Sequence, residues 1–278
     1  MIPVSSVLAC VVTLFVSLIL PVICLIVYAR RYKGGRIVSA WFLGAAGFFV
    51  PQVLIRLPLL NLLSASGTFQ TFAQNHILLY YLCLAFTAGL FEMVGRFAAA
   101  KGLGKILTPQ RAVAAGLGHG GIEAMILIGM TYISNLILIL MIQTGSFDAL
   151  IAQTAAAGAD VSQLEGIRQA LVNTPAGLFL AAGLERILTM ICHTALSALV
   201  CFGLVTHRTG KCLLLCLVLH TLLDISAAIQ YLLQKILSQT AAYCIVYVYL
   251  AGFALVSVLI LKHIRANWPS TLPEEAEP

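Results

Sequence analysis

The chain has 278 residues, of which 61% are hydrophobic and only 9% are charged, and its mean hydropathy is +1.01. A soluble domain has about 25% charged residues, so this composition excludes an ordinary soluble enzyme and predicts a protein that crosses a membrane several times. The formal net charge is +6, but the basic residues are divided among short connections instead of gathered on one face, which excludes a nucleic-acid-binding surface.

Seven apolar segments reach the length of about 20 residues that a helix needs to cross a bilayer. The segments are 5–29, 37–57, 77–99, 113–142, 177–205, 212–234 and 241–262. The first is not expected to be a cleavable signal peptide, because no basic residue precedes it and it is longer than the apolar core of such a peptide. We therefore expect an all-α polytopic membrane protein, a bundle of about seven transmembrane helices.

The basic residues alternate between the two sides of this expected bundle. Eleven belong to connections and span ends on one side: Arg30, Arg31, Lys33, Arg36, Lys101, Lys105, Arg111, Arg208, Lys211, Lys262 and Arg265. Three belong to the other side: Arg56, Arg168 and Lys235. Because connections rich in Lys and Arg stay in the cytoplasm, the pattern predicts a multi-pass protein of the cell membrane with its N-terminus outside and its C-terminus inside.

The connections on the outer side are the longer ones. We expect a loop over 58–76 and a second over 144–175, in which about 160–172 carry apolar residues at helical spacing, typical of an amphipathic helix at the membrane surface. A single transmembrane domain would then cover residues 1–264, followed by a disordered, Pro- and Glu-rich cytoplasmic tail over 265–278. The eight cysteines include no C-x-x-C pair and are expected to pack in the bundle, not to form disulfides.

Ionisable residues inside the predicted spans occur mainly as pairs four residues apart. The pairs are Glu92 with Arg96, His119 with Glu123, and His220 with Asp224. This spacing puts both side chains of a pair on one face of a helix. The fifth span adds Glu185, Arg186 and His193.

The energetic cost of these residues indicates that they share a site. A charged residue at the bilayer centre costs about 2.5–3.5 kcal/mol, so several of them must face one another or a wet cavity. Counted from the cytoplasmic ends of their spans at 1.5 Å per residue, five of them lie about 10–20 Å deep. These five are Glu92, Glu123, His193, His220 and Asp224. Glu185 would lie deeper, toward the outer leaflet.

Two carboxylates and two histidines inside a bilayer can activate a water for hydrolysis of a peptide bond. One carboxylate would act as general base, while the histidines and Asp224 would stabilise the oxyanion and protonate the leaving amine. The chain has no H-E-x-x-H zinc-protease motif and no G-x-S-x-G nucleophile elbow. Two other functions stay open for the same residues: a proton-coupled membrane transporter and a non-catalytic membrane partner subunit.

Four glycines surround the second pair, in the stretch GLGHGGIEA. Gly116 and Gly120 have the spacing that lets neighbouring helices approach closely. The glycines would also leave open space beside His119 and Glu123, unless packing is their only role.

The motifs FEMVGRF, GHGGIEA, ERILTMICH and LHTLLD follow one another on four successive predicted helices. Together they resemble the YhfC family of intramembrane proteases, which is grouped with the CAAX-prenyl and bacteriocin-processing (CPBP) proteases and with the PrsW proteases. The resemblance implies a membrane-anchored peptide or protein as substrate. The wider group opens its first motif with Glu-Glu, whereas this chain has Phe91 before Glu92, which counts against a mechanism with two adjacent carboxylates.

The resemblance also implies roles for individual residues. It makes Glu92, Glu123, His193, His220 and Asp224 catalytic, with Arg96, His119 and Arg186 in support. We favour a metal-free, glutamic-type peptidase without a cofactor. A metalloprotease is the alternative, in which Glu123, His193 and His220 hold zinc. A site made of Cys212, Cys216 and His220 is disfavoured, because one straight helix cannot wrap three residues around a metal.

Overall fold

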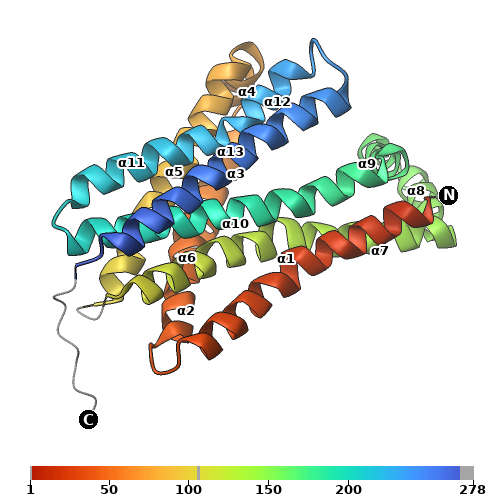
Figure 1. Ribbon diagram of the computed structural model, residues 1–278. Coiled ribbons are helices and arrows are strands. Elements are labelled where there is room, and N and C mark those ends of the chain that lie inside the picture. Colours follow the sequence, from red (N-terminus) through yellow and green to blue (C-terminus); the bar gives the residue numbers. More distant parts are fainter. Residues whose placement is uncertain (1, 105–106, 270–278) are drawn as a thin grey trace. The chain divides into compact units, whose positions relative to one another are not determined.

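The computed structural model describes residues 2–104 and 107–269, and within these ranges every regular element is a helix (Figure 1). Seven helical stretches are long and apolar enough to cross a membrane, as predicted. They are Val4–Arg31, Ile37–Ser64, Ile77–Gly102, Pro109–Thr144, Ala176–Val205, Thr209–Leu233 and Gln239–Ala266. The chain is therefore a multi-pass membrane protein, whereas the predicted orientation of its termini stays a prediction.

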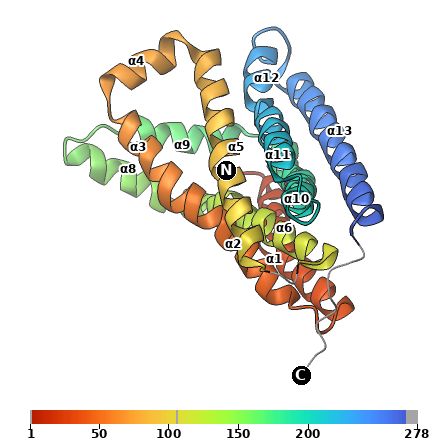
Figure 2. The same ribbon diagram turned by 90° about the vertical axis from the view of Figure 1, so that its left-hand side faces the viewer.

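Several of these stretches consist of more than one element (Figures 1 and 2). In chain order the elements are α1 (Val4–Arg31), α2 (Ile37–Phe48), the π-helix η1 (Phe49–Arg56), α3 (Leu57–Ser64), α4 (Gly67–Asn75), α5 (Ile77–Gly102), α6 (Pro109–Glu123), the π-helix η2 (Ala124–Gly129), α7 (Met130–Thr144), α8 (Ser146–Ala156), α9 (Ser162–Asn173), α10 (Ala176–Val205), α11 (Thr209–Asp224), α12 (Ser226–Leu233) and α13 (Gln239–Ala266).

The connection expected over 58–76 is largely helical, which corrects the sequence prediction. It contains most of α3 and all of α4. Pro58 stands in the first turn of α3, a position that proline tolerates, and the helix continues through it. The second connection contains α8 and α9, and α9 covers most of the segment expected to be amphipathic. The place of α9 at the membrane surface stays a prediction.

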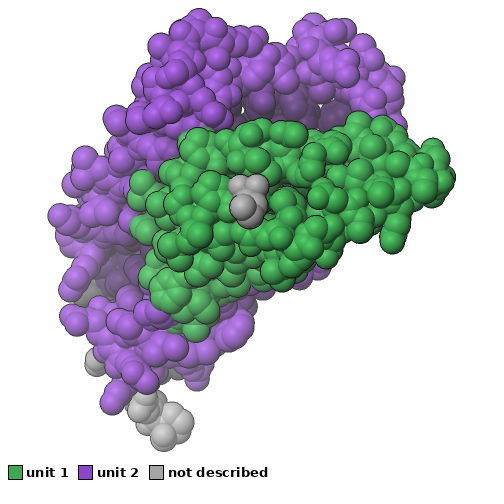
Figure 3. All heavy atoms as spheres, turned by 90° about the vertical axis from the view of Figure 1, so that its right-hand side faces the viewer, with its two compact units in different colours: residues 1–22, 124–187 green, residues 23–123, 188–278 purple. Residues whose placement is uncertain are grey.

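The chain divides into two compact units, coloured separately in Figure 3. Unit 1 comprises residues 1–22 and 124–187, and unit 2 comprises 23–123 and 188–278. One chain boundary between them falls inside α1, one inside α10 and one between α6 and η2. The predicted single domain over 1–264 stays a prediction.

Unit 1 is held together around the backbone carbonyl of Phe179. The Thr13 hydroxyl on α1 donates to this oxygen at 2.6 Å, and the Tyr132 hydroxyl on α7 donates to it at 3.0 Å. The Phe179 side chain belongs to a buried apolar cluster with Cys10, Ile139 and other residues of the same three helices. Hydroxyl groups thus join three helices where apolar contact alone gives little specificity in lipid.

Unit 2 depends on very close contacts between helices at glycines. A Cβ atom at Gly118 of α6 would overlap the backbone of Trp41 in α2, and one at Gly95 of α5 would overlap the backbone of Gly47 in α2. A Cβ atom at Gly116 would lie 2.5 Å from the Cα atom of Thr194 in α10. The glycines of α6 therefore allow tight packing, as predicted for Gly116.

The same geometry corrects the idea that these glycines leave open space. A Cβ atom at Gly120 would lie 3.1 Å from the Cβ atom of His193 and 3.1 Å from the Cα atom of Met190. The volume beside His119 is thus filled by α10. The glycines bring a helix toward the site instead of making a cavity in it.

The last helix of unit 2 packs on its neighbours along much of its length. Val246, Leu250 and Ala254 of α13 form a buried cluster with Cys192 of α10 and Leu223 of α11. All eight cysteines of the chain are free, in agreement with the sequence prediction. Helix α13 ends at Ala266, so the expected tail over 265–278 starts inside a helix; its residues 270–278 lie outside the described residues.

The contact at Gly118 predicts a large loss of stability when a methyl group is added. Gly118→Ala forces α2 and α6 apart, and overpacking of this kind costs about 1–3 kcal/mol. We expect a lower midpoint of thermal unfolding in detergent. The matched control is Gly252→Ala on α13, where a Cβ atom would meet nothing within 4 Å. An equal midpoint for both variants would show that the helices can separate without penalty.

Candidate active site

Four helices of unit 2 bring the predicted site residues together. Helix α5 supplies Glu92 and Arg96, α6 supplies His119 and Glu123, α10 supplies His193, and α11 supplies His220 and Asp224. All except Asp224 are buried, with exposed fractions of 1–8%. The side chain of Asp224 is 32% exposed. The i, i+4 pairs thus lie close together in unit 2. Their shared depth in the predicted spans had indicated this convergence.

The guanidinium of Arg96 lies at the centre of this cluster. Its Nη2 donates to Glu92 Oε2 at 3.1 Å and contacts His193 Nδ1 at 2.5 Å, while Nη1 contacts His220 Nδ1 at 3.2 Å. A guanidinium has only donors, so both imidazole Nδ1 atoms must act as acceptors. Both rings are therefore neutral and carry their proton on Nε2.

This assignment directs each Nε2–H toward a carboxylate. His193 Nε2 lies 2.8 Å from Glu123 Oε2, and His220 Nε2 lies 3.2 Å from Asp224 Oδ2. Arg96 thereby sets the tautomer of two histidines, and the Nε2 atom of each histidine lies close to a carboxylate. The result is a connected polar network inside an apolar helix bundle.

The third imidazole, His119, approaches Glu92 from the opposite helix. Its Nε2 donates to Glu92 Oε2 at 3.0 Å, its ring stacks on that of His193 with centroids 5.5 Å apart, and the edge of Phe48 packs against it. Its buried Nδ1 has no hydrogen-bond partner among the described residues. Burying an unpaired acceptor is costly, so this nitrogen marks a feature of functional interest.

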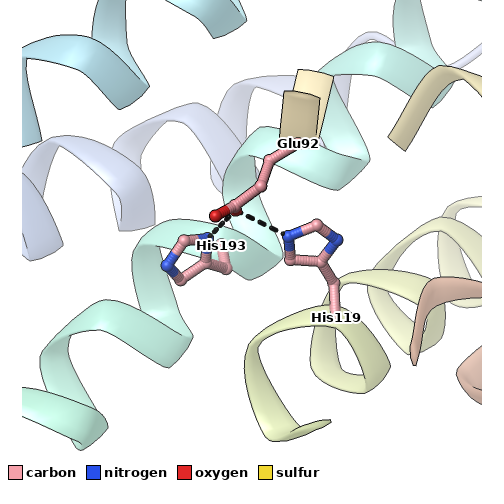
Figure 4. A group of neighbouring side chains, drawn as sticks. All are labelled: Glu92, His119 and His193. Atoms are coloured by element: carbon pink, nitrogen blue, oxygen red, sulfur yellow. Dashed lines mark hydrogen bonds and ion pairs between the residues drawn. The ribbon is translucent and has the colours of Figure 1, made fainter. Parts of the chain in front are cut away.

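Three of these residues could hold a metal ion. Figure 4 shows the His119 and His193 rings on either side of the Glu92 carboxylate, and one ligand atom from each lies within 4.8 Å of the others. Two histidines and a glutamate form a donor set of catalytic zinc enzymes. The set differs from the predicted Glu123, His193 and His220, and it includes His119, for which only a support role was predicted.

The chemistry of the donors is consistent with a bound metal. A metal on His119 Nε2 needs that proton to move to Nδ1, which is the nitrogen that has no partner. A metal on His193 Nδ1 needs Arg96 Nη2 to withdraw, since the guanidinium now occupies that lone pair. The residues therefore fit a divalent metal, provided that the arginine yields one contact.

Arg186 and Glu185 belong to unit 1. They form an ion pair with each other, and Arg186 is 7% exposed. The support role predicted for Arg186 stays a prediction. Cys212 and Cys216 do not belong to the potential metal-binding group found among the described residues.

Sequence reasoning missed Arg56, which it assigned to an outer connection. Arg56 is 6% exposed and ends η1, inside the stretch Ile37–Ser64. Its guanidinium donates to Leu84 O at 2.7 Å and to Thr87 Oγ1 at 3.2 Å, and its charge also interacts with those of Glu92 and Asp224. The only signal in the sequence was a single arginine in an apolar run, without an acidic residue at helical spacing.

Comparison with known proteins identifies the family of the chain. Residues 16–250 match the family model described as YhfC intramembrane metalloprotease. The chain belongs to the YhfC family. It is 28% identical over 251 residues to the uncharacterized membrane protein YhfC of Bacillus subtilis (strain 168), a match that covers 90% of this chain and 93% of that protein. No solved structure matches the chain.

The family description bears on the choice between mechanisms. It names a metalloprotease, so it favours a metal and does not support the metal-free, glutamic-type mechanism preferred from the sequence. The buried Glu92, His119 and His193 agree with the family description. Zinc, the alternative stated from the sequence, is compatible with both.

The position of Arg96 predicts a strong effect of its removal on stability. Arg96→Met leaves the buried Glu92 carboxylate without its ion-pair partner, and breaking a buried pair in this way costs about 3–5 kcal/mol. We expect this loss in the free energy of unfolding, measured by denaturant titration in detergent. Lys101→Met on the same helix is the control, because Lys101 is exposed. Similar losses in both variants would contradict the central role of Arg96.

Proposed function

We propose that this YhfC-family protein is an intramembrane endopeptidase that cleaves a membrane-anchored peptide or protein with the help of one divalent metal, zinc being the first candidate. The observation that supports the proposal most is the buried group of Glu92, His119 and His193 in a chain whose family is described as metalloproteases. Burial of ionisable residues inside a membrane costs free energy, and residues that carry this cost usually serve a function.

Glu92 Oε2, His119 Nε2 and His193 Nδ1 would hold the metal. When bound, the metal would activate a water for attack and polarise the carbonyl of the scissile bond. The helices of unit 2 exclude bulk water from this place, since the three residues are 1–3% exposed. Exclusion of water strengthens every electrostatic interaction in the site.

Glu123 is the general base of the proposed mechanism. Its Oε2 atom lies 2.8 Å from His193 Nε2, so it stands beside the proposed metal ligands without being one of them. Glu123 would take the proton of the attacking water and return it to the amine nitrogen of the leaving peptide. His193 would thus link the general base to the metal-binding group.

Arg96, His220 and Asp224 complete the arrangement. Asp224 accepts from His220 Nε2, and His220 Nδ1 accepts from Arg96, so the two residues fix the guanidinium from the side of α11. A fixed cation beside the scissile carbonyl would stabilise the developing oxyanion. With the N-terminus outside, the cluster would lie closer to the cytoplasmic face of the membrane.

Metal analysis tests the proposed ligands directly. We expect purified protein to carry about one equivalent of a divalent metal, measured by mass spectrometry of the elements, and His119→Ala to lose it, because three protein ligands are needed to hold a catalytic zinc. His220→Ala is the matched control, since it removes a buried imidazole that lies outside the proposed set. Retention of metal in His119→Ala with loss in His220→Ala would instead favour the set predicted from the sequence. Metal-free protein with full activity would favour the glutamic-type mechanism.

Removal of the general base should separate metal binding from hydrolysis. In Glu123→Gln we expect unchanged metal content but a loss of about 10²–10⁴-fold in cleavage rate, because proton transfer by a positioned group contributes that much. The measurement is quantitative proteomics of membrane peptides in cells that express either form, with purified protein for the metal content.

Glu185→Gln is the control for this experiment, since it removes a carboxylate of unit 1 from the same fold. Identical peptide profiles in wild type, Glu123→Gln and an empty-vector strain would contradict the protease proposal. Proton flux across vesicles that stops in Glu123→Gln, without any change in peptides, would indicate the transporter instead. A stable complex with another membrane protein, without proteolysis or proton flux, would indicate a non-catalytic partner subunit.

A further inference from the structure

A cavity of unit 2 lies at the ends of three helices. It has a volume of about 540 Å³ and is lined by the end of α1, the start of α6 and the end of α13. Tyr28 comes from α1 and Tyr32 directly follows this helix, Gln110 comes from α6, and Lys262 and Arg265 come from α13. The cavity shares no residue with the candidate active site. Figure 1 shows these three helix ends at one end of unit 2.

The cavity carries positive charge that is not compensated within the described residues. Lys262 and Arg265 are exposed, and no carboxylate of residues 2–104 or 107–269 pairs with either of them. The α6 helix also begins here, and the N-terminal end of a helix carries partial positive charge. An anion is therefore the ligand that this end of the cavity favours.

The remaining walls indicate what kind of anion fits. Tyr28 and Tyr32 pack with ring centroids 4.8 Å apart, and tyrosines of this kind are enriched at the level of lipid headgroups. Val113, Val258 and Leu261 make the rest of the lining apolar. A ligand with a charged head and an apolar body satisfies both parts, whereas a small soluble anion would leave the apolar wall unused.

We infer that this cavity binds the headgroup of an anionic phospholipid of the surrounding bilayer. The phosphate would lie against Lys262 and Arg265, with the tyrosine hydroxyls and Gln110 as further hydrogen-bond donors, and the glycerol and first methylenes would lie along Val113 and Leu261. Basic pockets between transmembrane helices recognise lipid headgroups in this way. The inference is independent of the proposed function, because it uses none of the proposed catalytic residues.

Native mass spectrometry of the full chain in detergent tests the inference. Dioleoyl phosphatidylglycerol and dioleoyl phosphatidylcholine, which share their acyl chains, are titrated against wild type and against Lys262→Gln with Arg265→Gln. Each cation near a headgroup contributes about fivefold in affinity, so we expect the double variant to lose roughly 25-fold for the anionic lipid and little for the zwitterionic one. Equal affinity of wild type for the two lipids would overturn the inference.

Two control variants make the result specific to the cavity. Arg208→Gln with Lys211→Gln removes two charges that lie outside the cavity and that the sequence predicts on the same side of the membrane, and should leave the affinity unchanged. An equal loss of affinity would mean general surface attraction. The acidic residues Glu274, Glu275 and Glu277 belong to the chain outside the described residues. Their replacement by Gln should also change nothing. A several-fold gain in lipid affinity would instead identify the tail as the occupant and overturn the lipid assignment.

Discussion

The candidate site depends on the compensation of one buried positive charge. The Arg96 guanidinium is 2% exposed inside a helix bundle that is apolar along most of its length. A charge in such surroundings costs several kcal/mol unless charge and hydrogen bonds surround it. Glu92 neutralises the charge, and His193 and His220 each accept one hydrogen bond, whereas the buried Nε has no partner among the described residues. Removal of any of these groups therefore affects the others, because they share one network.

The helices must come very close together for this network to form. Arg96 reaches His193 and His220 from a third helix only because neighbouring backbones approach one another at positions without side chains. Gly116 and Gly120 bring α10 against α6, and Gly95 brings α2 against α5. Small residues serve helix packing in lipid, where the hydrophobic effect gives no attraction between helices. In this chain they also set the distances between functional groups, so packing and chemistry are decided by the same residues.

Much of the fold was readable from the sequence, because the bilayer imposes one simple rule on length and polarity. The seven spans were predicted with bounds within about four residues, except that the second continues seven residues further, to Ser64. The shared depth of the i, i+4 pairs predicted their convergence. Periodicity gives the face of a helix that is polar but not the rotation of that face toward a neighbour. For this reason the sequence analysis named His220 as a possible zinc ligand, whereas the group of potential ligands in the structure contains His119. Arg56 was missed because its partners, Thr87 and the Leu84 carbonyl, are neutral groups on another helix.

His119 distinguishes a potential metal centre from a plain ion-pair network. Glu92 and His193 already contact Arg96, so on their own they are explained by the burial of that arginine. His119 forms no hydrogen bond with Arg96 among the described residues, so the burial of that arginine does not explain its presence. Its Nδ1 is buried without a hydrogen-bond partner. A neutral imidazole can move its proton from Nε2 to this free nitrogen and so release Nε2 as a ligand. The guanidinium then needs to give up only its contact with His193, since His220 still holds it on the other side.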